Sequence, residues 1–240
     1  MIHKTKGICL HTLKYGETSV IATIYTEELG RQSYMIKGAR GKKAKIKANM
    51  LQPLFMVDME VANKPGRELQ QLRELKSDFV YSSIPFDIMK NTQALFIAEF
   101  LFRSLRHEDP DSKLFQFISN SLKLFDLSEE GSANFTLFFL IELAGYLGID
   151  LKSGNINGNY FDMEEVCFVN NEPNHPLFLN RQLTNCLKTF FSGSILNLSE
   201  INVSNGERRA LFDKITQFFH LHIDGIGEIK SKKVLQEVFS

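Results

Sequence analysis

The sequence predicts an α+β chain in which a small five-stranded barrel precedes a helical domain. Alternating hydrophobic residues dominate the first 80 positions, and helical spacing of hydrophobic residues replaces this alternation afterwards. Charge changes at the same point, because residues 1–76 hold 14 Lys and Arg against 7 Asp and Glu, whereas residues 77–240 hold 14 against 21. We therefore expect two modules with different partners, a barrel over residues 1–80 and a helical domain over residues 81–240.

The barrel is expected from short strand patterns that turns separate. Residues 18–25 are rich in β-branched side chains, and hydrophobic residues alternate over residues 55–61. Leucines at a spacing of three make residues 69–75 as compatible with a helix as with a strand. Five short strands in about 80 residues are typical of the OB-fold. The turn-forming pairs are Tyr15-Gly16, Leu29-Gly30 and Pro65-Gly66.

The helical domain is expected to begin after Ser82-Ser83-Ile84-Pro85, because Ser and Pro favour the start of a helix. Ser204 and Glu207 match a capping box, which predicts the start of a later helix. Hydrophobic residues at helical spacing predict further helices over residues 86–105, 114–127 and 135–147, and from Leu183.

The strongest local signal for function is a basic segment between two hydrophobic strands. Six Lys and Arg residues fall within positions 37–47, and no acidic residue lies among them. Its glycines would let a phosphate approach the backbone, and each cation would displace a condensed counterion. The alternative is a solvated basic surface, but the lack of acidic neighbours favours a nucleic-acid contact.

The same region resembles the bacterial recombination mediator family RecO. The similarity extends to the end of the chain, so it covers the whole sequence. The motifs that carry it are Gly7-Ile8-x-Leu10, Tyr15-Gly16-Glu17, Thr26-x-x-x-Gly30-Arg31, Lys37-Gly38-Ala39-Arg40 and Leu51-Gln52-Pro53, with His222 and Ile229-Lys230-Ser231 near the end.

The resemblance implies an N-terminal OB-fold, a C-terminal helical domain, binding of single- and double-stranded DNA, and annealing of complementary strands. It also implies that the protein works with RecR and with the C-terminal tail of the single-stranded DNA-binding protein SSB to load the recombinase RecA. Arg31, on the strand before the basic segment, is a lesser candidate for DNA binding. The family's DNA-binding loop falls on Lys37, Arg40, Lys42, Lys43, Lys45 and Lys47.

Residues 148–180 depart from the family pattern. They are rich in Gly, Asn and Pro, and predict an irregular insertion with room for one short hairpin. Many members of the family carry four zinc-binding cysteines here, whereas this insertion offers Cys167 and His175 where a structural zinc site needs four ligands. We expect no metal or other cofactor. The cysteines Cys9, Cys167 and Cys186 are few and far apart, so we expect reduced thiols.

Two weaker candidates have simpler interpretations. The turn Gly225-Ile226-Gly227 could present backbone amides to phosphate, but an exposed connection to a short terminal helix explains it as well. Asp58 and Glu60 share one strand face and could hold magnesium in a nuclease, yet such pairs are common on half-exposed strands. The sequence lacks a phosphate loop, a nucleophile elbow and an H-E-x-x-H motif, so we expect that the protein is not an enzyme.

The leading hypothesis is a recombination mediator that changes no covalent bond. The rival is a protein-interaction adaptor whose basic loop contacts an acidic protein surface instead of DNA. The sequence has neither a run of 18 apolar residues nor an apolar signal segment. We therefore expect a cytoplasmic protein without membrane contact that joins the nucleoid during repair.

Overall fold

The computed structural model describes residues 2–42, 44–106, 109–152 and 154–238. The chain forms two compact units, one of residues 1–126 with 229–235 and the other of residues 127–228 with 236–240. The first two helices therefore group with the barrel, although they follow the boundary that the sequence pattern suggests. None of the helices in the described part of the chain combines the length and the hydrophobicity that a membrane span needs.

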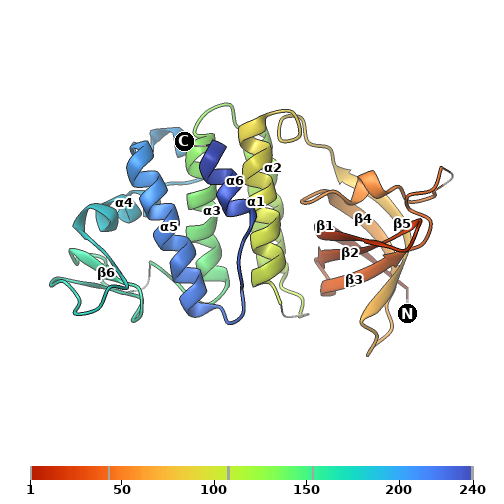
Figure 1. Ribbon diagram of the computed structural model, residues 1–240, viewed down its shortest axis with the longest axis horizontal. Helices are drawn as coiled ribbons and strands as arrows, with labels where there is room; N and C mark the ends of the chain where they lie inside the picture. Colours follow the sequence, from red (N-terminus) through yellow and green to blue (C-terminus); the bar gives the residue numbers. More distant parts are fainter. Residues whose placement is uncertain (1, 43, 107–108, 153, 239–240) are drawn as a thin grey trace. The chain divides into compact units, whose positions relative to one another are not determined.

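The first unit contains a closed barrel with the strand order β1-β2-β3-β5-β4 (Figure 1). Neighbouring strands are antiparallel except β3 and β5, which pair in parallel over only three residues of each strand. This OB-like barrel, followed by a helical region, confirms the predicted fold class. The strands are β1 (Ile2–Tyr15), β2 (Ser19–Thr26), β3 (Gly30–Ile36), β4 (Met56–Ala62) and β5 (Leu69–Phe79), and a short 3₁₀ helix, η1 (Ala48–Leu51), precedes β4.

The ambiguous leucine segment is strand β5, and a β-bulge explains its unusual spacing. Leu72 lies opposite Val61 of β4, whereas Glu74 lies opposite the preceding residue, so Arg73 is an extra residue in β5. A bulge shifts the alternation by one position. Leu72 and Leu75, three residues apart, therefore both pack against the barrel core.

Helices α1 (Ile88–Ser104) and α2 (Ser112–Leu127) follow the barrel. Asp87 caps α1 by accepting hydrogen bonds from two backbone amides, so the helix begins later than Ser82–Pro85 suggested. The amides of Ser82, Ser83 and Ile84 instead donate to the buried carboxylate of Asp126 at 2.7–2.8 Å. This carboxylate fixes the connection between β5 and α1.

The second unit combines helices with a small sheet in the order β7-β6-β8. The sheet lies within residues 148–180, so the insertion holds three short strands, one more than a hairpin needs. The predicted capping box is confirmed, because Ser204 and Glu207 exchange hydrogen bonds at the start of α5. The elements are α3 (Ser132–Tyr146), β6 (Tyr160–Asp162), β7 (Cys167–Val169), β8 (Phe178–Leu179), α4 (Arg181–Phe191), η2 (Leu198–Glu200) and α5 (Asn205–His222), and a last helix, α6 (Ser231–Val238), begins in the first unit and ends in the second.

Candidate nucleic-acid interface

The basic segment after β3 is a loop whose small and hydrophobic residues anchor it in the barrel. Ala39 and Ile46 are only 4% and 6% exposed and belong to the barrel core. The backbone amide of Arg40 donates to the carbonyl oxygen of Thr18 at 2.9 Å, which ties the loop to the β1–β2 turn. The loop is therefore held by its apolar residues and backbone, and its basic side chains are left to face solvent.

The structure places the predicted loop cations on the surface, but it gives one of them an acidic neighbour. Lys43, which was also predicted, lies outside the described residues. Lys45 donates to the Glu74 carboxylate of β5 at 3.0 Å, and this hydrogen bond lowers the pKa of Glu74. The expectation of no acidic neighbour was therefore wrong, because Glu74 is close in space and distant in sequence. The exposed loop cations are Lys37, Arg40, Lys42, Lys45 and Lys47.

A groove of about 470 Å³ lies between the loop, the end of β3 and the start of β5. Four of the described residues that line it are cationic and none is acidic. Clefts lined by charges of one sign focus the electric field and concentrate ligands of the opposite sign. Anions are therefore the ligands that this groove favours. Its cations are Lys37, Lys45, Arg67 and Arg73.

Sequence reasoning missed Arg67 and Arg73. Arg67 lies in the β4–β5 loop, which Gln70 stabilises through hydrogen bonds with the backbone of Lys64 and Arg67. The Pro65-Gly66 turn was a usable signal, because this loop borders the oligonucleotide site of OB-folds. Arg73 is the bulged residue of β5, and bulges often redirect a side chain beside a functional site. The three-residue spacing of Leu72 and Leu75 reflects that bulge, but the same spacing is compatible with a helix, so the sequence alone did not locate it.

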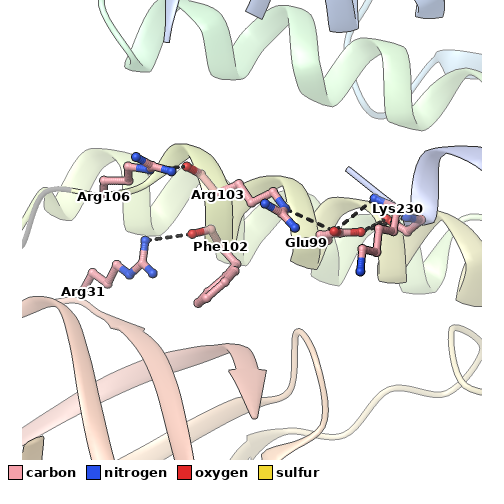
Figure 2. Close-up of polar contacts among 7 residues, drawn as sticks. Arg31, Glu99, Phe102, Arg103, Arg106 and Lys230 are labelled. Carbon is pink, nitrogen blue, oxygen red and sulfur yellow. Dashed lines mark hydrogen bonds and ion pairs between the residues drawn. The ribbon is translucent and has the colours of Figure 1, made fainter. Parts of the chain in front are cut away.

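Arg31, the lesser candidate, holds the end of α1. Its Nη1 donates to the carbonyl oxygens of Phe102 and Leu105 at 2.7 and 2.6 Å, and Figure 2 shows the first of these contacts. A cation is favourable there, because the carbonyl groups at the end of a helix carry partial negative charge. The guanidinium carbon also lies 4.7 Å from the centroid of the Phe102 ring. A contact of Arg31 with DNA stays a prediction.

The two acidic residues of β4 that suggested a nuclease lie opposite lysines. Asp58 is paired with Lys6 and Glu60 with Lys4 in the β1–β4 register. The Lys6 ammonium donates to Asp78 of β5 at 2.7 Å, and opposite charges at facing positions of two strands are a common way to stabilise a sheet. In the parts of the chain that the structure describes, no three His, Cys, Asp or Glu side chains are grouped to hold a metal ion.

The helix start that follows the Gly225–Gly227 turn is occupied by a carboxylate. The amides of Lys230 and Ser231, at the start of α6, donate to Glu99 of α1 at 3.1 and 2.8 Å. Such amides are the donors that a phosphate at a helix start needs. In the structure Glu99 therefore caps the start of α6.

The insertion holds a carboxylate–imidazole pair. The Nε2 atom of His175 lies 3.0 Å from the Asp162 carboxylate, and its Nδ1 accepts the amide of Leu177. The neutral ring therefore carries its proton on Nε2. Burial alone would raise the pKa of Asp162, but hydrogen bonds from Glu165, His175 and Glu164 outweigh it and lower the pKa.

All three cysteines are free. Burial raises the pKa of Cys9 to about 12 and that of Cys186 to about 11. Burial also raises the pKa of Cys167. The reactive thiolate is therefore scarce at neutral pH at each position, which is the behaviour of structural cysteines.

The barrel, its cation-lined groove and the helices that follow define an OB-like protein with an added helical region. Two family models match the chain, and both describe the same family. Residues 1–78 match the family model described as "Recombination protein O N terminal", and residues 85–233 match "Recombination protein O C terminal".

Full-length relatives agree with these family models. The chain is 33% identical to the DNA repair protein RecO of Phocaeicola vulgatus and 34% identical to that of Bacteroides fragilis, with 100% of each chain covered. It is 31% identical to the DNA repair protein RecO of Flavobacterium psychrophilum, with 99% of each chain covered. The chain therefore belongs to the RecO family of DNA repair proteins.

Proposed function

We propose that this protein binds single- and double-stranded DNA through the loop of residues 37–47 and the adjoining groove. The observation that carries the proposal is the groove itself. Among the described residues that line it, four are cationic and none is acidic. By neutralising the phosphates of two strands, the cations reduce their repulsion and let complementary bases meet. The protein then anneals strands and helps to load a recombinase onto SSB-coated DNA without changing a covalent bond.

We assign the protein partners to the helical part of the chain. Residues 77–240 carry 14 Lys and Arg against 21 Asp and Glu, so this part is acidic on balance and is less suited to DNA as a whole than the basic barrel. That part is therefore available for the SSB tail and for RecR. A full-length protein with a neutralised loop is expected to retain both partners in a pull-down, with a scrambled tail peptide as the control. Loss of both partners would count against separate roles for the two parts.

The DNA-binding proposal is tested by replacing Lys42, Lys43, Lys45 and Lys47 together with Gln. Each lost phosphate contact reduces the salt slope of binding by about 0.9 on duplex DNA and about 0.7 on single strands. Four contacts would therefore remove nearly four units on duplex DNA. Fluorescence anisotropy at several salt concentrations measures both the affinity and the slope.

A matched control separates local contacts from the overall charge of the protein. Replacing four cations of helices α2, α4 and α5 with Gln changes the net charge equally, and it is expected to leave DNA binding nearly unchanged. A loop variant that keeps its melting temperature and its full DNA affinity would refute the proposal. A wild-type protein that binds acidic proteins but shows no salt-dependent DNA binding would support the adaptor instead. The control positions are Lys113, Arg181, Arg209 and Lys214.

A further inference from the structure

A second cation-lined recess, of about 530 Å³, lies in the first unit at the end of α1. Helix α1 supplies Phe102 and Arg103 to its wall, and Arg106 follows shortly after the helix (Figure 2). Among the described residues, three guanidinium groups and one carboxylate line the recess, so this lining carries a net positive charge. The lining residues are Arg31, Ser33, Glu68, Phe102, Arg103 and Arg106.

Strand β3 and the residue after it connect this recess with the groove. Arg31 and Ser33 line the recess, whereas Met35 and Lys37 line the groove. Alternate residues of a strand point to the same side, and the intervening Tyr34 is buried in the barrel. These four side chains therefore lie along one outer face, which spans about 20 Å at roughly 3.3 Å per residue.

Contacts within the protein hold the arginines of the recess in place. The Nε atom of Arg103 lies 3.1 Å from the Glu99 carboxylate, and the Nε atom of Arg106 donates to the Arg103 carbonyl oxygen at 3.2 Å (Figure 2). Burial alone would raise the pKa of Glu99, but hydrogen bonds from Ser231, Lys230 and Arg103 outweigh it and lower the pKa. The negative charge of Glu99 is therefore shared between Arg103 and the start of α6. The guanidinium groups, held in place by these contacts, offer planar arrays of donors that match phosphate oxygens.

We propose that this recess is a second phosphate-binding site, which takes the backbone of a single strand after it has crossed the groove. The inference rests on the proposed function, because the groove must first bind nucleic acid. The bound strand then runs from the basic loop along the outer face of β3 to the end of α1. Recognition is through the phosphodiester backbone, so it does not depend on base sequence.

The test compares the length dependence of binding in two variants, Arg106→Gln and Arg103→Gln/Arg106→Gln. The probes are fluorescent oligothymidylates of about 6, 12 and 24 nucleotides, which bracket the roughly 4–16 nucleotides bound by an OB-fold. The shortest probe is expected to bind both variants like the wild type, because the groove alone accommodates it. On the longest probe, the salt slope is expected to fall by about 0.7 for each lost contact.

Controls and outcomes separate this proposal from the proposed function. Arg181→Gln/Arg209→Gln changes the charge equally on α4 and α5 and is expected to leave every probe unaffected. If the double variant loses thermal stability with the Glu99 contact, the single variant at the exposed Arg106 still decides the question. Unchanged slopes on every length would refute the second site and leave the loop as the binding site. If the wild type bound no probe, the proposed function would fail and this inference with it.

Discussion

Exposed loop cations and a buried lysine of the first unit carry the same charge and differ in how far they are buried. Loop cations such as Lys42 and Lys47 are exposed. Lys90, by contrast, is 5% exposed and donates to the Ser83 hydroxyl at 2.7 Å and the Asp126 carbonyl at 3.0 Å. A buried cation that satisfies protein oxygens stabilises the fold, whereas an exposed cation on an anchored loop is available to phosphate. Burial, and not the charge, therefore separates the two roles.

The largest effect is expected from Asp126→Ala, because Asp126 is the buried acid beside Lys90. The Asp126 carboxylate accepts the amides of Ser82, Ser83 and Ile84 and the Ser82 hydroxyl. Without it these donors lose their partners, so we expect a loss of about 3 kcal/mol in the free energy of unfolding. Urea denaturation measures this. The control is Asp87→Ala, because exposed Asp87 caps α1 and a lost cap costs about 1 kcal/mol.

The pH dependence of the same variant sharpens the test. Burial alone would raise the pKa of Asp126, but hydrogen bonds from the amides of Ile84, Ser82 and Ser83 outweigh it and lower the pKa. A lowered folded-state pKa gives stability above the unfolded value of about 3.9, and this stability is lost as the pH falls through the folded value. The difference between wild type and variant is therefore expected to be constant near neutrality and to shrink in acid. A difference that grows in acid would contradict this role.

The second prediction sets Arg31 against Lys37, which share one face of the β3 segment. Arg31→Gln removes two hydrogen bonds to the end of α1, so we expect a loss of about 2 kcal/mol in stability. Lys37→Gln changes an exposed groove residue, so we expect a stability change within about 0.5 kcal/mol and weaker DNA binding. Thermal melts and anisotropy check the pair together. An Arg31 variant of full stability that loses DNA binding would reverse the assignment.

Much of the fold follows from local sequence patterns, because hydrophobic alternation and helix caps act over a few residues. The capping box at Ser204 is such a case, and so is the strand pattern of residues 18–25. Long-range contacts leave no such pattern. Nothing near Arg31 in sequence predicts its carbonyl partners 71 and 74 residues away, and nothing near Lys45 indicates Glu74. The sequence therefore located the basic loop and could not complete the groove.

The third prediction concerns the groove residues that sequence reasoning missed. Arg67→Gln/Arg73→Gln removes two of the four cations that line it. If both contact phosphate, the salt slope on duplex DNA is expected to fall by about 1.8 units. Both residues are exposed, so each change is expected to alter stability by no more than about 0.5 kcal/mol. If this variant bound DNA as tightly as the charge-matched control Arg181→Gln/Arg209→Gln, the interface would be confined to the loop.

The smallest effect is expected from Glu74→Gln, which removes the acid beside the loop. The hydrogen bond and the charge of Lys45 lower the pKa of Glu74, so Glu74 remains charged and competes with phosphate for this lysine across the neutral range. Neutralising Glu74 is expected to tighten DNA binding and to raise the duplex salt slope by up to about 0.9 units, the value of one phosphate contact. Glu172→Gln is the matched control, because Glu172 is an exposed acid in the insertion and lines neither the groove nor the recess. Anisotropy with both variants at several salt concentrations distinguishes release of Lys45 from a general change in charge. Equal gains in the two variants would show that Lys45 contacts no phosphate, and the interface would then depend on the remaining loop and groove cations.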